Sequence, residues 1–353
     1  MAKENKKIRI AINGFGRIGR VFFKLVFERE DIEVVAINDL SDKANLSYLL
    51  KYDTPYGRCF QNCLGVFNDI KFLNEPVPQY LPWKDLDIDV VIEATGAFNT
   101  YQKASAHIEA GAKRVILTAP VKSEKPVEVQ PPQVEVGPPK IPDYDISGKT
   151  VLMGINDDEL KTCQISANGS CTTNAVGPVL QIFNQTVGVE KAILNTIHSY
   201  TSTQKLVDSP NKKDFRKGRA AGQNIIPTST GAAVATTLAI KDLAGKFDGM
   251  AMRVPTVLGS IVDLTFISKV ETTVEKINGI LKEANKDKIW ENVFTVTEEP
   301  IVSSDIIGDP YASIVDLSLT RVIGGNLVKV LIWYDNEMGY ARTLVKHLLA
   351  TQD

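Results

Sequence analysis

The chain has 353 residues, of which 44% are hydrophobic and 23% charged, and its formal net charge is −2. These values are typical of a globular protein with room for two domains, and they argue against a nucleic-acid-binding surface spread over the whole chain. No apolar stretch approaches the length of a membrane-spanning helix, and the first residues lack a signal-peptide pattern. We therefore expect neither a membrane nor a nucleic acid as a primary partner.

Cysteine and histidine are scarce, with four cysteines and three histidines. Four cysteines are too few for a disulfide framework at this length, which favours a reducing compartment and a cytoplasmic location. Cys59 and Cys63 have neither a second cysteine pair nor clustered histidines beside them. We therefore expect no metal site.

The first predicted elements are a strand, a glycine turn, a helix and a second strand. A buried-strand pattern leads directly into G-F-G-R-I-G at 14–19. Gly14 permits a tight turn, Gly16 a close approach to a pyrophosphate, and Gly19 close packing of helix and strand. Asp39 ends the second strand about 20 residues later, where an acid binds the ribose 2′-hydroxyl and repels a 2′-phosphate. The pattern predicts NAD binding, and the alternative is an ordinary α/β turn without a ligand.

Two further α/β units follow the glycine turn. Residues 88–96 predict a buried strand that ends in a threonine–glycine turn, and residues 113–120 predict another strand. Between them, residues 101–111 predict a helix that ends at Gly111. His107 lies on this helix with no acid–base partner in view, so we expect it to be structural or exposed.

Residues 121–149 interrupt the pattern with six prolines and neither cysteine nor histidine. Their centre, V-E-V-Q-P-P-Q-V-E-V, is nearly palindromic, and its alternating arms suit a small hairpin. A solvated, extended Pro-rich loop is the alternative. Neither structure supplies catalytic side chains.

The second half of the chain predicts a mixed or antiparallel sheet partly covered by helices. Residues 151–156 have strand character, and a helix begins at Cys171. Later segments such as S-I-V-D-L-T-F-I-S alternate with the period of a half-buried strand. The segment N-E-M-G-Y-A-R-T-L-V-K-H-L-L predicts a closing helix. The fold class is therefore α/β, with a nucleotide-binding half followed by an α+β half.

Cys171 has hydroxyl-bearing neighbours, Ser170 and Thr172, where a structural cysteine would have apolar ones. A helix N-terminus stabilises a thiolate, and His198 at the end of a predicted strand is a suitable base. Beside a nicotinamide, a thiolate can add to an aldehyde, and loss of hydride then leaves a thioester. The alternative is a buried, inert cysteine with its histidine elsewhere.

Hydroxyl and guanidinium groups in the same half of the chain suit phosphate recognition. They belong to Ser170, Thr172, Thr201, Thr203, Thr230 and Arg253. Together with the cysteine and the histidine, these groups predict oxidation of a phosphorylated aldehyde through a covalent thioester.

Eight motifs follow one another along the chain. They are A-I-N-G-F-G-R-I-G-R, A-I-N-D-L, S-C-T-T-N, H-S-Y-T-S-T-Q, R-K-G-R-A-A, N-I-I-P-T-S-T-G-A-A, A-M-R-V-P-T and W-Y-D-N-E-M-G-Y. In these motifs the sequence resembles phosphorylating glyceraldehyde-3-phosphate dehydrogenase over nearly its full length. The resemblance implies a Rossmann-type parallel-sheet NAD domain at 1–170, onto which 337–353 pack, and a catalytic domain with a mixed, mainly antiparallel sheet at 171–336.

The resemblance also implies an activity and an assembly. The activity is oxidation and phosphorylation of glyceraldehyde 3-phosphate to 1,3-bisphosphoglycerate with NAD and inorganic phosphate, a step of glycolysis and gluconeogenesis. The assembly is a homotetramer, in which a basic loop at about 201–223 lies against the cofactor of a neighbouring subunit.

Roles for individual residues follow from the same resemblance. Cys171 would be the nucleophile and His198 the base. The substrate's phosphate would be bound by Thr201, Thr203 and Arg253. The attacking phosphate would be bound by Ser170, Thr230 and Gly231, with Thr172 close by. The cofactor would be bound by Asn13, Gly14, Gly16, Arg17, Ile18, Asp39, Thr95, Gly96, Thr118, Asn336 and Tyr340.

Three features depart from the family's pattern. The Pro-rich stretch at 121–149 is longer than the family's usual connection, Asn74 stands where an arginine is common, and Ala175 replaces a frequent second cysteine. Two other functions stay open. One is erythrose-4-phosphate dehydrogenase, which shares S-C-T-T-N, and the other is a non-catalytic scaffold whose basic loop binds RNA or a protein.

Overall fold

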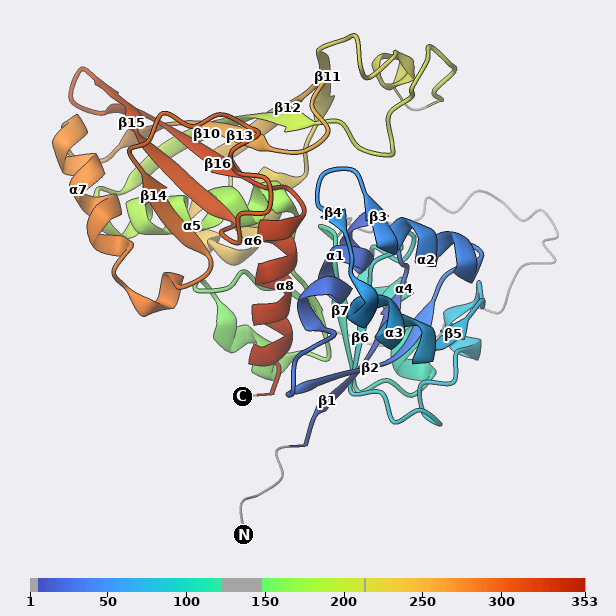
Figure 1. Cartoon of the computed structure of the whole chain (residues 1–353). Coiled ribbons are helices and arrows are strands. Elements are labelled where there is room, and N and C mark those ends of the chain that lie inside the picture. The colour runs from blue at the N-terminus through green and yellow to red at the C-terminus, as the bar shows by residue number, and fades with distance from the viewer. Residues whose placement is uncertain (1–5, 122–147, 213, 353) are drawn as a thin grey trace, which may run out of the picture.

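A computed structural model describes residues 6–121, 148–212 and 214–352. In these parts of the chain, two seven-stranded sheets and a two-stranded hairpin form two domains side by side (Figure 1). The hairpin considered for the Pro-rich segment would fall at 122–147, outside the described residues. Within the described ranges, no helix has both the length and the apolar character needed to span a membrane.

The first sheet is parallel throughout, with strand order β5-β2-β1-β6-β7-β9-β8. Its strands are β1 (Ile8–Asn13), β2 (Ile32–Asn38), β5 (Lys71–Leu73), β6 (Val90–Glu93), β7 (Arg114–Leu117), β8 (Gly148–Thr150) and β9 (Ile165–Ala167). The helices of this region are α1 (Arg17–Val26), α2 (Lys43–Lys51), α3 (Gln61–Asp69) and α4 (Tyr101–Glu109). Parallel strands need crossover connections, which helices usually supply, and this arrangement confirms the Rossmann-type prediction.

The position of β1 in this sheet determines where a ligand can bind. β1 pairs with β2 on one side and with β6 on the other, so the strand order changes direction there. In open α/β sheets, ligands bind beyond the carboxyl ends of the strands at such a switch point. The carboxyl ends of β1, β2 and β6 are Asn13, Asn38 and Glu93.

The strand predicted at 151–156 is wrong, because the chain pairs with β9 only as far as Thr150. Beyond it the chain turns. Asn156 holds the turn closed, since its Oδ1 accepts from the Leu152 N–H at 2.9 Å and its Nδ2 donates to the Thr150 carbonyl at 2.9 Å. Gly154 has φ of +83°, a conformation outside any strand. The apolar residues Val151, Leu152 and Met153 are buried, which explains the misleading pattern.

The second sheet is mixed, with order β11-β12-β10-β13-β16-β15-β14 and four antiparallel and two parallel pairs. Its strands are β10 (Val189–Ser199), β11 (Ile226–Ser229), β12 (Phe247–Val254), β13 (Ser260–Ser268), β14 (Phe294–Thr297), β15 (Ser313–Ile323) and β16 (Leu327–Tyr334). Helices α5 (Cys171–Thr186), α6 (Ala232–Ala239) and α7 (Val274–Ala284) accompany it. α5 packs on this sheet through a continuous apolar core that includes Val176, Leu180, Phe183 and Phe266. The mainly antiparallel prediction is confirmed.

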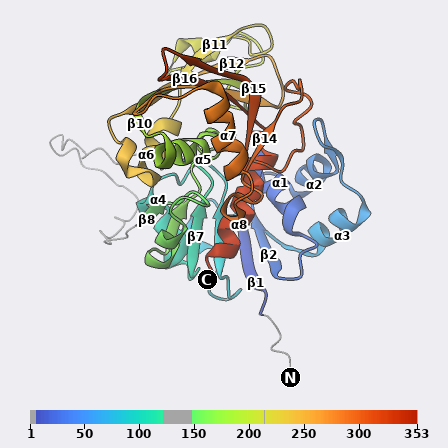
Figure 2. The same cartoon turned by 90° about the vertical axis from the view of Figure 1, so that its left-hand side faces the viewer.

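Helix α8 (Met338–Ala350) runs between the two domains (Figures 1 and 2). Its Leu344, Val345 and Leu348 belong to the same apolar cluster as residues of β1 and α1. The last helix therefore completes the core of the first domain. The residue limits predicted for the two domains stay a prediction.

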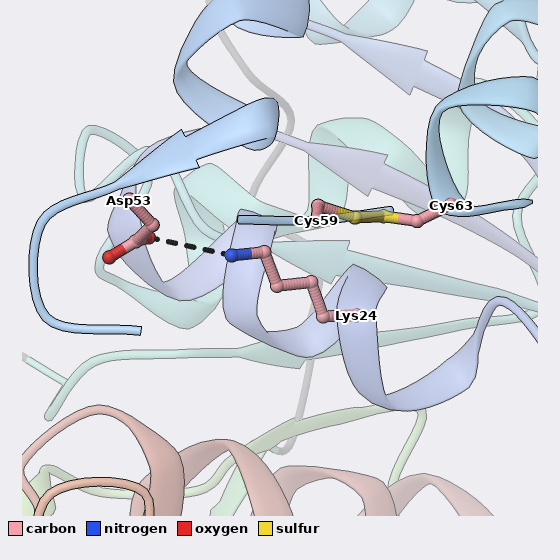
Figure 3. Close-up of a disulfide and its surroundings, with 4 residues drawn as sticks. All are labelled: Lys24, Asp53, Cys59 and Cys63. Atoms are coloured by element: carbon pink, nitrogen blue, oxygen red, sulfur yellow. Dashed lines mark ion pairs between the residues drawn. A yellow bond between two sulfur atoms is a disulfide. The ribbon is translucent and has the colours of Figure 1, made fainter. Parts of the chain in front are cut away.

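A short hairpin, β3 (Tyr52–Asp53) and β4 (Gly57–Arg58), precedes a disulfide between Cys59 and Cys63 (Figure 3). The Cα atoms of the two cysteines are 6.1 Å apart, within the range that a disulfide bridges. The expectation that the cysteines form no disulfide is therefore wrong for this pair, which lies one helical turn apart at the start of α3. Asp53 on the hairpin also forms an ion pair with Lys24 of α1, at 3.6 Å (Figure 3).

Candidate functional site

A hollow of about 410 Å³ opens at the switch point of the parallel sheet. Five of the predicted cofactor residues line it: Asn13, Gly14, Gly16, Asp39 and Thr95. They follow β1, β2 and β6, so three separate strands contribute to one wall.

The glycines of the turn show what this hollow can accommodate. Gly14 has φ of +95°, and a Cβ on it would lie 2.7 Å from the Ala94 carbonyl carbon. A Cβ on Gly19 would lie 2.3 Å from the Gly14 carbonyl oxygen, so this glycine lets α1 approach β1 closely. At Gly16, by contrast, a Cβ would meet nothing within 4 Å. Its bare backbone faces open space at the start of α1, which fits a bound pyrophosphate.

The carboxylate of Asp39 is fixed at the edge of this hollow. Its Oδ2 accepts from the Phe15 N–H at 2.7 Å, and its Oδ1 accepts from the Ser41 N–H at 2.8 Å. Asn74 donates to the Asp39 carbonyl at 2.9 Å, so the residue that replaces the usual arginine stabilises this turn. The carboxylate keeps further lone pairs for a ribose hydroxyl.

A buried network lies beneath the hollow. Glu93 Oε2 accepts from Asn13 Nδ2 at 2.6 Å and lies 3.0 Å from His107 Nε2, while its Oε1 binds the Thr95 N–H and hydroxyl. Trp83 Nε1 can only donate, so His107 Nδ1, 3.0 Å away, accepts a hydrogen bond from it. The other ring nitrogen, Nε2, therefore carries the proton and donates to Glu93. His107 is therefore structural and fully buried, and the expectation that it has no acid–base partner is wrong.

The pair predicted to be catalytic, Cys171 and His198, lies where α5 begins and β10 ends. Ser170 caps α5 by accepting from the Thr173 N–H at 3.1 Å, which places Cys171 at the first helical position. Cys171 Sγ lies 3.4 Å from Nε2 of the buried His198. Burial raises the pKa of the Cys171 thiol, opposed by the positive charge of Arg253. Burial also lowers the pKa of His198 to about 3, assisted by the same charge. Both groups are therefore neutral near pH 7.

Arg253 lies beside His198 because the two residues pair across the parallel strands β10 and β12. Arg253 Nη1 is within hydrogen-bond distance of His198 Nδ1 and donates to the Ser199 carbonyl at 3.0 Å. A guanidinium can only donate, so where Nδ1 accepts from Arg253 the imidazole proton lies on Nε2, towards Cys171. Nδ1 is also 2.7 Å from the Ser199 carbonyl, and donation to that oxygen places the proton on Nδ1 instead.

Comparison with known proteins agrees with this geometry. Residues 8–101 match the family model described as glyceraldehyde 3-phosphate dehydrogenase, NAD binding domain, and residues 170–336 match the C-terminal domain of the same enzyme. The chain is 47% identical to a glyceraldehyde-3-phosphate dehydrogenase of Thermotoga maritima, over 96% of this chain and 98% of the relative. It is 43% identical to one from Streptomyces coelicolor, over 96% of both chains. It is 41% identical to glyceraldehyde-3-phosphate dehydrogenase 2 of Bacillus subtilis, over 98% of this chain and 97% of the relative.

The chain belongs to the glyceraldehyde-3-phosphate dehydrogenase family. It is an NAD-dependent oxidoreductase of glycolysis that oxidises glyceraldehyde 3-phosphate, and the resemblance read from its motifs is confirmed. The bare Gly16 backbone and the Asp39 carboxylate fit the NAD that this family uses.

Other predicted cofactor residues of the dehydrogenase lie outside the hollow and have protein partners. Arg17 binds Glu337 through Nε at 2.9 Å and Asp53 through Nη1 at 2.7 Å, so it joins α1 to the residue before α8 and to the hairpin. Tyr340 is buried and donates to the Gly169 carbonyl at 3.2 Å. Thr118 donates to the Glu93 carbonyl at 3.0 Å. The cofactor roles of these residues, and those of Ile18, Gly96 and Asn336, stay predictions.

The hydroxyl groups predicted to bind phosphate fall into two arrangements. Thr201 and Thr203 lie in the loop after β10, with their hydroxyl oxygens 2.9 Å apart. Thr230 accepts from the Ala232 N–H at 3.2 Å, just before α6, and Gly231 follows it. Ser170 is the N-cap of α5 and accepts from the Thr173 N–H at 3.1 Å. Both hydroxyls therefore lie at helix N-termini, where N–H groups and the helix dipole favour anions.

The sequence did not indicate Tyr334 as part of the catalytic site. Its hydroxyl lies 2.9 Å from Thr172 Oγ1 and 2.7 Å from Thr196 Oγ1, and its ring packs edge-on against His198 with centroids 6.0 Å apart. Both the hydroxyl and the backbone N–H of Thr172 lie near the thiol, and each lowers the pKa of Cys171. Its sequence signals were Tyr334's place at the end of a predicted strand and in the motif W-Y-D-N-E-M-G-Y, which gave no role to this tyrosine.

Proposed function

We propose that this dehydrogenase couples oxidation of D-glyceraldehyde 3-phosphate to its phosphorylation, through a thioester on Cys171. The observation that carries the proposal is the pair formed by Cys171 Sγ and His198 Nε2, 3.4 Å apart beside Arg253. A nucleophile with an adjacent base and a cation for an anionic substrate is the set that this chemistry requires.

Substrate binding would prepare the base. Thr201, Thr203 and Arg253 would bind the substrate's phosphate. Once Arg253 turns to that phosphate, His198 Nδ1 is free to donate to the Ser199 carbonyl, 2.7 Å away. Nε2 then carries the lone pair and can accept the thiol proton, while neutralisation of Arg253 raises the low pKa of the imidazole.

The proposed covalent steps use two groups of the chain, the Cys171 thiol and the His198 imidazole. Cys171 sulfur attacks the aldehyde carbon, and His198 returns the thiol proton to the new oxyanion, which gives a hemithioacetal. His198 takes the hemithioacetal hydroxyl proton as the carbon loses a hydride, and the product is a thioester. Bound NAD supplies the hydride acceptor. Asn13, Gly14, Gly16 and Asp39 would hold the adenosine and pyrophosphate parts of NAD, and Asn336 the nicotinamide carboxamide.

Inorganic phosphate would complete the reaction. Ser170, Thr230 and Gly231, near the N-termini of α5 and α6, would bind it with the Thr172 N–H close by. A phosphate oxygen attacks the thioester carbon, the carbon–sulfur bond breaks, the proton of the phosphate passes to solvent, and 1,3-bisphosphoglycerate leaves. The sulfur recovers its proton from His198, so no net proton remains on the protein.

The loop after β10 supports a homotetrameric assembly as part of this proposal. Leu206 and Phe215 are 88% and 87% exposed, and Val207 and Ile225 are exposed beside them. This segment projects beyond β11 and β12 at the edge of the molecule (Figure 1). Apolar side chains gathered on one projecting segment indicate a protein contact. Sedimentation analysis tests the assembly, and a monomer at micromolar concentration would contradict it. We also propose a cytoplasmic location, on the ground of the glycolytic activity, because the Cys59–Cys63 disulfide removes the argument from cysteine content.

NADH formation from glyceraldehyde 3-phosphate, with and without inorganic phosphate, tests the proposed activity. We expect sustained turnover only with phosphate, and without it at most one equivalent of NADH per active site. Erythrose 4-phosphate serves as the competing substrate. Turnover that does not depend on phosphate, or a higher kcat/KM for erythrose 4-phosphate, would contradict the proposal.

A further inference from the structure

We propose that Ser199 and Ser260 are positioning residues for the nicotinamide end of the cofactor, and that they act through Asn336. The inference rests on the proposed role of Asn336, which it deepens by assigning the groups that orient its amide.

The three side chains come from three separate parts of the second domain. Ser199 ends β10, Ser260 begins β13, and Asn336 follows β16. The Ser199 hydroxyl donates to Asn336 Oδ1 at 2.9 Å, and the Ser260 hydroxyl donates to the same oxygen at 3.1 Å. All three residues are buried, so water does not compete freely for these bonds.

These bonds determine which way the amide faces. The Ser260 oxygen already accepts the Ser199 N–H at 3.1 Å, so its own proton needs an acceptor. Asn336 Oδ1 is that acceptor, and turning the amide over would leave both hydroxyl protons without it. Asn336 Nδ2 makes no hydrogen bond to any described residue, and this atom retains contact with solvent. The serines thus leave a donor free for a ligand.

The surroundings of Asn336 place that donor between the two halves of the site. The Ser199 carbonyl accepts from Arg253, beside the Cys171–His198 pair. On the other side, Glu337 binds Arg17, at the start of α1 next to the glycine turn. A dinucleotide that extends from the glycine turn to Cys171 therefore passes Asn336 with its nicotinamide end.

The ligand chemistry follows from this arrangement. A fixed N–H donor selects a strong acceptor, which on the nicotinamide ring is the carboxamide oxygen. A sulfur atom in that position accepts hydrogen bonds weakly. The serines should therefore contribute to the preference for NAD over thionicotinamide adenine dinucleotide, in which sulfur replaces that oxygen.

Calorimetric titration of the cofactor-free enzyme with both dinucleotides tests the inference. Ser199→Ala and Ser260→Ala are the test variants, and Ser268→Ala is the matched control. Ser268 is a buried serine at the other end of β13, whose hydroxyl donates to the Val270 carbonyl. We expect each test variant to weaken NAD binding about fivefold, the loss of one hydrogen bond, and to weaken binding of the thio analogue by less than about twofold. Thermal midpoints check that each variant is folded.

Three results would overturn the inference. Equal weakening of both dinucleotides would mean that the serines act on structure alone. Unchanged NAD binding in both serine variants would mean that Asn336 needs no support. A third variant, Asn336→Asp, separates the inference from its premise, because it removes the donor itself. If Asn336→Asp binds NAD with normal affinity, the proposed role of Asn336 is contradicted together with the inference. If Asn336→Asp binds NAD weakly while both serine variants bind it with normal affinity, only the inference is contradicted.

Discussion

The two sheets build their halves of the site in opposite ways. In the parallel sheet, the cofactor hollow depends on atoms that are absent, since Gly16 leaves open space and Gly14 and Gly19 have no room for a Cβ. In the mixed sheet, the proposed reacting groups are the side chains of Cys171 and His198, which are positioned by the start of a helix and the end of a strand. We therefore expect that added atoms impair NAD binding at the parallel sheet, and that removed atoms impair catalysis at the mixed sheet.

The largest expected effect is in the catalytic half. Replacing Cys171 with serine removes the nucleophile, so we expect a loss of at least about 10³-fold in turnover with glyceraldehyde 3-phosphate and NAD. Cys163→Ser is the matched control, because Cys163 is also a free cysteine but belongs to no site described above. Equal activity losses in the two variants would contradict the assignment.

The next effect concerns stability at acid pH, where both halves contribute a buried neutral histidine. Burial lowers the pKa of His347 to about 3 in the folded protein, with a smaller contribution from Arg114. Its Nδ1 lies 3.2 Å from Asn168 Oδ1 and its Nε2 2.8 Å from Ser166 Oγ, which suits the neutral ring. Between pH 6.5 and 3 the unfolded chain binds the proton and the folded chain does not, so stability falls as pH falls.

This loss amounts to at most about 5 kcal/mol for one histidine over that window. We expect His347→Gln to flatten the dependence of the free energy of unfolding on pH, measured with denaturant. His198→Gln should flatten it similarly but also abolish activity. A slope unchanged by the His347 replacement would contradict the assignment of a neutral ring.

A smaller effect is expected in the network beneath the cofactor hollow. His107→Phe preserves the ring but leaves Trp83 Nε1 and Glu93 Oε2 without their histidine partner. We expect a loss of about 2–3 kcal/mol in the free energy of unfolding. His107→Gln, which retains a donor and an acceptor, should lose less. If the two variants are equally stable, hydrogen bonding at His107 is unimportant.

The smallest effect tests the cofactor half directly. Gly16→Ala adds one methyl group to open space, so stability should hardly change while NAD binding weakens about tenfold, because the group lies where the pyrophosphate approaches. Gly19→Ala, with its Cβ 2.3 Å from the Gly14 carbonyl oxygen, should instead lower stability. Unchanged NAD affinity in Gly16→Ala would place the pyrophosphate elsewhere.

Local patterns in the sequence predicted most of the fold. The glycine turn with its strand and helix, the helix at Cys171 and the alternating strands all depend on neighbours in sequence, and each appears in the structure. The strand prediction for residues 151–156 was wrong because their apolar character has a different cause. They lie in a buried turn that the Asn156 side chain closes. A strand pattern alone does not distinguish the two cases.

The sequence revealed less about the site's supporting groups, because these meet across long separations. Glu93 and His107 come together through the packing of α4 on the parallel sheet, and Tyr334 reaches His198 only after β16 and β10 are placed in one sheet. Serine and tyrosine hydroxyls are common, so Ser260, outside every motif, and Tyr334, inside W-Y-D-N-E-M-G-Y, are not marked as parts of the site. Their roles depend on strand order, which periodicity does not specify.

The course of helix α8 has a consequence for how the chain is made. Leu344, Val345 and Leu348 fill the same core as Ile10 and Phe22, so the first domain lacks part of its interior until residue 348 has been synthesised. The second domain lies between these two contributions, and on the ribosome it can fold while the first still exposes apolar surface. A chain that terminates before α8 would leave that surface open to chaperones and proteases, which would remove it before it could compete with complete subunits.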